Sequence, residues 1–139
     1  MAAISGKLAK VMYGAVKVAS MVTWTLSGYE SQILEITEMG DTVQKFIFGG
    51  AANPGTVTFS GNYDPADTTG QISLNTACKS EIPLTNLYFY ETTTKYWAVD
   101  IGGSILVTKA DAITMDRNAV GKIDFSGKVS GAAMVVKGT

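Results

Sequence analysis

The feature that most constrains the fold of this chain is a repeated alternation of apolar and polar residues. Between Lys17 and Ser27, one set of alternate positions is apolar and the other is mainly threonine and serine. The apolar set is Val18, Val22, Trp24 and Leu26, and the polar set is Lys17, Thr23, Thr25 and Ser27. Because successive side chains of a β-strand point to opposite faces, this pattern predicts a strand with one buried side.

Strand-like patterns continue along most of the chain. In residues 31–39, Leu34 and Ile36 alternate with Glu35 and Thr37. Further runs of the same character occupy residues 44–50, 56–61, 85–91, 95–101, 104–109, 121–131 and 132–138. A chain with this pattern is expected to be mainly β, folded as an antiparallel β-sandwich with barrel-like character.

Two short segments predict how neighbouring strands connect. In GAANPG, Asn53, Pro54 and Gly55 are typical turn residues. Gly102 and Gly103 separate two alternating runs, and a two-residue hairpin turn needs positive φ angles, which glycine adopts readily. We therefore expect the strands before and after this glycine pair to form a β-hairpin.

One segment, residues 67–81, has a helical pattern instead. Apolar residues recur there at roughly helical spacing, at Ile72, Leu74, and Ala77 or Cys78. Asp67 or Thr68 is a suitable N-cap, and Pro83 lies just beyond the end. Gly70 in the first turn costs about 1 kcal/mol relative to alanine. The prediction is a single short helix on the side of the sandwich.

Composition excludes several classes of function. The formal net charge is −1, so there is no basic excess to neutralise nucleic-acid phosphates. Histidine is absent, which removes the commonest general base and zinc ligand, and the single Cys78 excludes a disulfide framework. With 46% hydrophobic and 17% charged residues, we expect one domain over residues 1–139 and a surface that becomes buried against a partner.

The N-terminal residues 1–26 contain early lysines and then an apolar stretch, which is the general composition of a signal peptide. Lys17 interrupts that stretch, and the valines around it alternate as in a strand. No apolar run approaches the roughly 18 residues of a membrane span. We expect neither a targeting segment nor a membrane partner.

The stretch GNYDPADTTGQISL, residues 61–74, places the carboxylates of Asp64 and Asp67 close together, with Gly70 after them. An EF-hand calcium loop needs oxygen ligands at positions 1, 3 and 5, glycine at 6 and glutamate at 12. Counted from Asp64, position 3 is alanine and position 12 is asparagine, and counted from Asp67 the glycine arrives at position 4. We therefore expect a turn and a helix cap here, with no metal and no cofactor.

Acid–base chemistry and nucleophilic catalysis are also not indicated. The carboxylate pairs are Asp64 with Asp67, Glu35 with Glu38, and Asp111 with Asp116. Sequence spacing does not place any pair across a cleft, as glycoside hydrolysis requires, and acidic residues are common on exposed sheet faces. Cys78 has no histidine to activate it and is typical of a small buried apolar residue. No catalytic residue is predicted, and we do not expect an enzyme.

Aromatic residues gather in two neighbouring runs. They are Tyr88, Phe89, Tyr90, Tyr96 and Trp97. Aromatic residues are ordinary strand formers, and half of an alternating hairpin must face the core. A core contribution combined with a subunit interface is favoured. The alternative from another functional class is a carbohydrate-binding β-sandwich module that uses these rings.

Taken in order, four segments resemble the major tail tube protein of long-tailed bacteriophages with non-contractile tails. They are SGYESQILEITEMGDTVQKFIFGG, TVTFSGNYDPADTTGQISLNTA, NLYFYETTTKYW and IDFSGKVSG, and the likeness runs roughly from Val18 to Gly131. The resemblance implies a β-sandwich with one flanking α-helix, whose subunits join into a ring-shaped β-barrel. Six copies would form each ring, and rings would stack into a hollow tube. The same architecture occurs in inner tubes of contractile phages, injection systems and type VI secretion, which is the alternative reading.

The resemblance also implies where contacts lie. The tip of an extended hairpin, together with the terminal arms, would reach the next ring, which assigns this contact to Met39, Gly40, Asp41 and Thr42. Polar faces of the central strands would line the lumen, with Thr23, Thr25, Glu35, Thr37, Asp124 and Ser126 as the candidates. A neutral to acidic lining rich in threonine and serine would let DNA slide through without being held.

The implied function is that of a structural virion protein that self-assembles into a conduit for DNA delivery into the host. The expected partners are further copies of the chain, tape-measure, tail terminator and distal tail proteins, and DNA that passes without specific binding. The protein would assemble in the host cytoplasm and reside in the virion tail.

Overall fold

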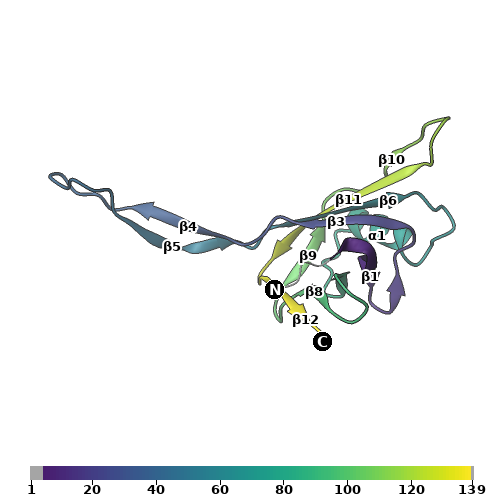
Figure 1. The fold of residues 1–139 in the computed structure, drawn as a ribbon, viewed down its shortest axis with the longest axis horizontal. Coiled ribbons are helices and arrows are strands. Elements are labelled where there is room, and N and C mark those ends of the chain that lie inside the picture. Colours follow the sequence, from purple (N-terminus) through teal and green to yellow (C-terminus); the bar gives the residue numbers. More distant parts are fainter. Residues whose placement is uncertain (1–4, 139) are drawn as a thin grey trace.

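The computed structural model describes residues 5–138, and Figure 1 shows two packed sheets from which a long two-stranded arm projects. Residues 1–4 and Thr139, the ends of the predicted terminal arms, lie outside the described residues. The elements are η1 (Gly6–Leu8), β1 (Lys10–Tyr13), β2 (Val16–Lys17), β3 (Met21–Leu26), β4 (Glu30–Glu35), β5 (Phe46–Asn53), β6 (Thr56–Asn62), α1 (Gln71–Lys79), β7 (Leu87–Tyr90), β8 (Tyr96–Val99), β9 (Ser104–Val107), β10 (Ala112–Thr114), β11 (Lys122–Ser130) and β12 (Met134–Lys137).

The strands form two main sheets and a separate pair. The first sheet has the order β12-β8-β7-β1-β2. The second has the order β10-β11-β6-β3, and β9 also pairs with β11. β4 and β5 pair only with each other, and the pairing is antiparallel throughout. This arrangement confirms the predicted antiparallel β-sandwich with one α-helix, and the sheets are not closed into a barrel within the chain.

The core lies between the two main sheets. Phe59 of β6 stacks on Phe125 of β11 with ring centroids 5.0 Å apart, and meets the edge of Phe89 of β7 at 5.4 Å. All three rings are almost completely buried. Because β7 belongs to the first sheet and β6 and β11 to the second, these aromatic contacts join the two layers.

The α-helix is shorter than predicted, and its buried face differs. Leu74 and Ala77 enter the core, but Ile72 is 37% exposed. Gly70 occupies the N-cap position instead of Asp67 or Thr68, but the Asp67 carboxylate accepts the N–H groups of Gly70 and Gln71 at the start of the helix. A Cβ atom on Gly70 would lie 2.4 Å from the Asp67 carboxylate, and this close approach favours glycine at the N-cap. No helix in residues 5–138 has the length and hydrophobicity needed to cross a lipid bilayer.

The predicted strand over residues 17–27 is two strands in different sheets. The chain turns at Ser20, whose φ is 57°, so β2 belongs to the first sheet and β3 to the second. The pairing of β3 with β6 shifts register between Met21 and Thr23. This β-bulge leaves Val22 66% exposed, which corrects its predicted place on the buried side. The alternation was read correctly on either side of the irregularity.

The predicted hairpin at Gly102 and Gly103 is wrong. A turn is present, with Gly102 at φ 89° and the Gly103 N–H donating to the Asp100 carbonyl at 3.1 Å. The strands on its two sides do not pair, because β8 is already flanked by β7 and β12. The turn instead carries the chain from the first sheet to β9 on the second. The hairpin of β7 and β8 is confirmed.

Candidate assembly surfaces

The arm, residues 30–53, extends away from the sandwich as a continuation of β3 and β6 (Figure 1). Every residue of β4 and nearly every residue of β5 is exposed. The alternation of Leu34 and Ile36 with polar residues therefore does not correspond to a face buried within the chain. An isolated two-stranded hairpin is marginally stable in water, so the arm is a segment that gains from being covered.

Both faces of the arm carry apolar side chains. Ile33 pairs with Phe48, and the adjacent Leu34 pairs with Ile47. Since neighbouring positions of a strand point to opposite faces, one pair lies on each side of the hairpin. Phe48 is 78% exposed and the other three are about half exposed. Exposed apolar surface of this kind is typical of interaction sites, and the arm has it on both faces.

The tip of the arm is a hydrogen-bonded turn. The Asp41 carboxylate accepts the N–H of Glu38 at 2.8 Å and lies 3.5 Å from the Lys45 ammonium. Gly40 has φ 97°, and Met39 is fully exposed. All four residues predicted to contact the next ring, Met39, Gly40, Asp41 and Thr42, lie in this turn. The extended hairpin is present as predicted, while the contact itself stays a prediction.

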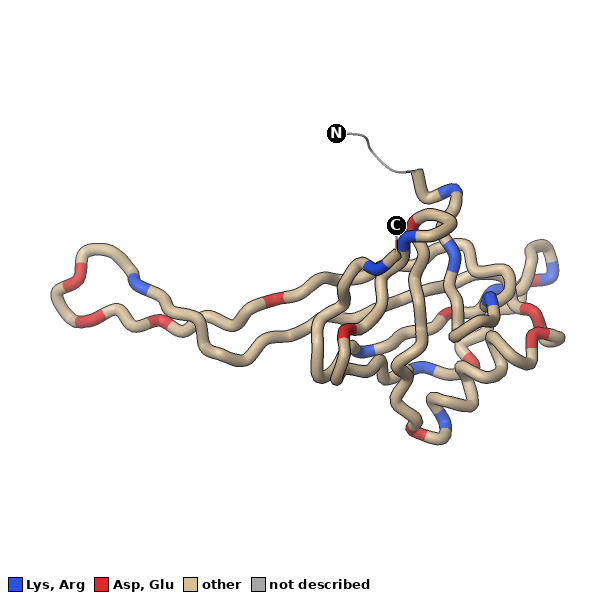
Figure 2. The backbone as a smooth tube through the Cα atoms, turned by 90° about the horizontal axis from the view of Figure 1, so that it is seen from below, with Lys and Arg blue, Asp and Glu red and all other residues tan. Residues whose placement is uncertain are grey.

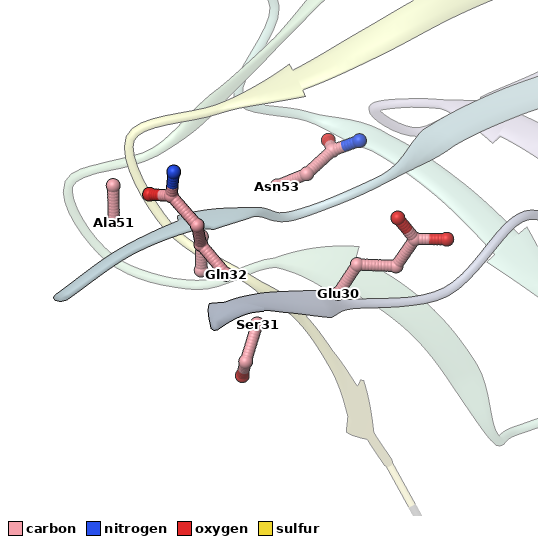
Figure 3. Close-up of a pocket in the computed structure, with 6 residues that line it drawn as sticks. Glu30, Ser31, Gln32, Ala51 and Asn53 are labelled. Carbon is pink, nitrogen blue, oxygen red and sulfur yellow. The ribbon is translucent and has the colours of Figure 1, made fainter. Parts of the chain in front are cut away.

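The base of the arm is polar and irregular. The pairing of β4 with β5 shifts register between Ser31 and Ile33, and a Cβ atom on Gly49 would lie 3.2 Å from the Gln32 side chain. Figure 3 shows Glu30, Gln32 and Asn53 extending to one side, around a hollow of about 390 Å³, and Ser31 to the other. Asn53 is the last residue of β5, and its side-chain oxygen accepts the N–H of Gly55 at 3.0 Å, so Asn53, Pro54 and Gly55 form the turn as predicted.

The outward face of the second sheet is lined with hydroxyl groups. Two rows cross β3, β6 and β11, one formed by Thr25, Thr58 and Ser126, and the other by Thr23, Ser60 and Asp124. We call these six residues the hydroxyl face. Thr23 and Ser60 are hydrogen-bonded through their hydroxyls at 3.1 Å. The six residues line a shallow hollow of about 340 Å³, together with Lys109.

The hydroxyl face brings together four of the six predicted lumen residues. The other two, Glu35 and Thr37, lie on the arm, where the Thr37 hydroxyl donates to the Glu35 carboxylate at 3.0 Å. The sequence analysis missed Thr58 and Ser60. The sequence alternation could have identified them. Each lies next to a phenylalanine or valine that alternation places in the core, so Thr58 and Ser60 are expected on the outward face. Whether either set lines a lumen stays a prediction.

A second protrusion, the hairpin of β10 and β11, lies at the end of the molecule opposite the arm (Figure 1). Its turn holds Arg117, the only arginine of the chain. Met115 is 71% exposed and Val120 63%. The Asp116 carboxylate is used within the turn, where it accepts the N–H of Asn118 at 3.0 Å. Sequence analysis did not single out this hairpin.

The carboxylates of the stretch 61–74 are bound to backbone groups. The Asp67 carboxylate accepts N–H groups from Ala19, Gly70 and Gln71 at 2.8 to 3.2 Å. The fully buried Gln71 amide donates to the carbonyls of Ala19 and Asn62 and accepts the N–H of Asp64. This network fastens the start of α1 to β6 and to the link before β3. The burial of Gln71 was not predicted, because a polar residue at the start of a helix is usually exposed.

The other candidate catalytic groups are also engaged or dispersed. Asp111 forms an ion pair with Lys79, and among the described residues no three acidic or cysteine side chains cluster as metal ligands would. Cys78 is half-buried, not fully buried as predicted, and lines an apolar hollow of about 280 Å³ beside Leu106 and Ile82.

The aromatic cluster is divided by the hairpin of β7 and β8. Phe89 and Trp97 are opposite each other on the core side, and Trp97 packs against the core. Tyr88 and Tyr90 lie on the outer side, each with its ring centroid about 5 Å from that of Tyr96. The predicted core contribution is therefore present, with Trp97 partly buried against the core.

Solved structures with a similar fold come from phage-like particles. A chain from the virion of a native gene transfer agent superposes with a TM-score of 0.71 at 13% identity, over 97% of this chain and 99% of that chain. A chain from the tail of an empty gene transfer agent particle, solved with C6 symmetry, has a TM-score of 0.68 at 13% identity over 99% of both chains.

Chains from an anti-feeding prophage and from a contractile injection system provide similar matches. A chain from the tube-terminating cap of the anti-feeding prophage has a TM-score of 0.67 at 11% identity, over 100% of this chain and 93% of that chain. A chain from the extended sheath–tube complex of an extracellular contractile injection system has a TM-score of 0.67 at 12% identity, over 99% and 93%. The chain has a tail-tube fold. No protein-family model matches the sequence, and neither does any curated protein.

The arm belongs to the tail-tube fold. It spans residues 30–53, which is far more than the small part of the chain that these superpositions leave unmatched. The matched part of this chain therefore includes the arm. This agrees with the resemblance seen in the sequence at the level of the fold.

Proposed function

We propose that this protein is the tail tube subunit of a long-tailed bacteriophage with a non-contractile tail. Six copies form a ring, and rings stack into a hollow tube that conducts DNA into the host. The protein is structural and has no catalytic activity. The proposal rests above all on one observation, which is that the arm of a tail-tube fold exposes apolar side chains on both faces.

The edges of the second sheet support ring formation. Among the described strands β3 pairs only with β6, and β10 pairs only with β11, so both ends of this sheet have unpaired backbone groups. Open edges of this kind are templates for pairing with another chain. Joining β3 of one copy to the far edge of the next gives a closed barrel when the rotation between copies closes. The C6 symmetry of the gene transfer agent tail is consistent with six copies.

The hydroxyl face suits the wall of a DNA channel. Its threonine and serine side chains offer hydrogen bonds without the positive charge that would hold phosphates. Asp124 adds one negative charge, while Lys109 lines the same hollow and Lys122 lines a smaller one beside Asp124. We therefore propose Thr23, Thr25, Asp124 and Ser126 as lumen-lining residues. Glu35 and Thr37 lie on the arm, and we propose that they take part in the contacts of the arm instead of lining the lumen.

Partners and location follow from this role. The tube would contact a tape-measure protein inside, a terminator at one end and distal tail proteins at the other. Subunits would assemble in the host cytoplasm and remain in the virion tail. We also expect residues 1–139 to act as one domain, which would unfold in a single cooperative transition.

An alternative role is the inner tube of a contractile tail or injection system. It is favoured by the similar TM-score of the chain from a sheath–tube complex. The two roles differ in whether the outside of the tube binds a sheath. Co-purification of the tube with a sheath protein encoded beside it would identify the contractile case.

Electron microscopy of the purified protein tests the proposal. We expect concentrated protein to form rings and tubes in negative stain, with sixfold averages viewed along the axis. A chain that stays monomeric at all concentrations and salt conditions would contradict a tube-forming role. Rings with another symmetry would support assembly into rings but would contradict the proposed number of six copies.

A further inference from the structure

The two protrusions of the molecule have complementary surfaces. We infer that the tip of the arm in one copy docks onto the β10–β11 hairpin of a copy in the next ring. This inference rests on the proposed function, because it names the surface that receives the arm in a stacked tube. The occupant of the hairpin is therefore a second copy of the same chain.

Opposite charge is the first argument. The arm carries four carboxylates, Glu30, Glu35, Glu38 and Asp41, and one cation, Lys45. Figure 2 shows this acidic arm projecting from a body on which both signs are mixed. Lys45 is beside Asp41, so the carboxylate of Glu38 is the exposed acidic group of the tip that no cation neutralises in the described residues.

The receiving hairpin carries the matching cation. Arg117 is exposed in its turn and forms no ion pair within residues 5–138. Of the nearby carboxylates, Asp111 is neutralised by Lys79 and Asp116 accepts a hydrogen bond inside the turn. An arginine side chain offers a planar fork of donors that a carboxylate can accept in pairs. Arg117 is therefore available for a carboxylate from outside the chain.

Exposed apolar residues on both protrusions are the second argument. The tip of the arm presents Met39 and Val43, and the hairpin presents Met115 and Val120. Each is more than 60% exposed, so each is accessible to another chain. Contact between the two protrusions would cover these four side chains and surround them with the charged pair.

The position of the protrusions is the third argument. They lie at opposite ends of the longest axis of the molecule (Figure 1). Copies that stack head to tail in one direction bring unlike ends together, which is the geometry of a filament. A contact between one arm tip and one β10–β11 hairpin therefore repeats without limit along a tube.

Charge reversal tests the inference. We expect Arg117→Glu and Glu38→Arg each to raise the protein concentration needed for tubes by about tenfold or more, since a modest pair energy recurs in every subunit of a ring. The double variant should assemble within about threefold of the unaltered protein. Lys17→Glu, an exposed change of the same sign on β2, is the control for Arg117→Glu and should have little effect.

Cross-linking provides a test that does not depend on charge. In a Cys78→Ala background, Met39→Cys combined with Val120→Cys should give a ladder of disulfide-linked chains when tubes are oxidised, because a disulfide requires Cα atoms about 4.4 to 6.8 Å apart. The control combines Met39→Cys with Ile101→Cys, which is 92% exposed at the link between β8 and β9. No ladder is expected from the control.

The outcomes separate the inference from the proposed function. Tubes from the unaltered protein, combined with unchanged assembly of Arg117→Glu and no specific ladder, would overturn the docking site and leave the tube role standing. An unaltered chain that never assembles would overturn both. Rescue by the double charge reversal together with a specific ladder would establish the contact.

Discussion

The sandwich and the arm use the same kind of strand in opposite ways. Phe59 of β6 is 2% exposed inside the sandwich, whereas Phe48 of β5 is 78% exposed on the arm. Both are phenylalanines in strands rich in apolar residues, and only a short link separates β5 from β6. The surface that covers Phe59 comes from the same chain. Phe48 is not covered in this way, and under the proposed function its covering surface comes from another copy.

This difference separates two sources of stability. Burying apolar area stabilises a fold by roughly 25 cal/mol per Å², whether the covering surface is in the same chain or a neighbour. For the sandwich this free energy belongs to folding of the monomer. For the arm, under the proposed function, it belongs to assembly, so we expect that the two regions can be altered independently.

The largest expected effect comes from removing the arm. Replacing residues 31–52 with a short Gly-Ser linker should abolish rings and tubes, while changing the free energy of unfolding of the monomer by less than about 1 kcal/mol. Negative-stain images and chemical denaturation measure the two quantities. Loss of the sandwich fold in this variant, or tubes that persist without the arm, would contradict the view that the sandwich determines monomer stability and the arm determines assembly.

A matched pair of phenylalanine truncations is the next test. Phe59→Ala should destabilise the monomer by about 3 to 5 kcal/mol, because it leaves a cavity in the core. Phe48→Ala should change monomer stability by less than about 0.5 kcal/mol and weaken assembly. Denaturation midpoints give the first comparison and light scattering the second. Equal destabilisation of the monomer by both changes would mean that the arm is buried within the chain.

Sequence alternation predicted the sandwich because it reports which faces are apolar. It could not tell whether an apolar face is covered by the same chain, so Leu34 and Ile36 look the same in sequence as Val57 and Phe59. Only the resemblance to tail tube proteins distinguished the arm. The sequence around two neighbouring strands also does not determine whether they pair, because the partner of a strand can lie far away along the chain.

The failed hairpin shows this limit clearly. Gly102 and Gly103 do form a turn, as their sequence indicates. The pairing failed because β12, far along the chain, occupies the edge of β8. The bulge at Val22 escaped prediction for a similar reason, because one extra residue changes the face of those around it without changing composition. Turn residues therefore predicted where the chain turns, whereas pairing between strands distant in the sequence determined the sheet topology.

Two aspartates allow the sandwich and the arm to be compared again, with a smaller expected effect on stability. Asp67 in the sandwich and Asp41 at the arm tip both accept backbone N–H groups. Asp67→Ala should cost the monomer about 2 to 3 kcal/mol, since it removes a charged acceptor from three part-buried N–H groups. Asp41→Ala should cost less than about 0.5 kcal/mol, because the tip is exposed to water. Thermal unfolding of the two variants tests the ranking, and a reversed order would be inconsistent with it.

The smallest effect is expected on the hydroxyl face. Thr58→Val keeps the shape of the side chain and removes a hydroxyl that no described hydrogen bond requires, so monomer stability should change by less than about 0.5 kcal/mol. If this face lines a water-filled lumen, assembly should also be unchanged, because no neighbouring copy packs against it. Denaturation and negative-stain imaging measure both. A loss of tubes with a folded monomer would identify the hydroxyl face as a third contact surface between copies and remove it from the lumen. The neighbouring Ser126→Ala is the control, since both residues lie in one row across the sheet and should behave alike.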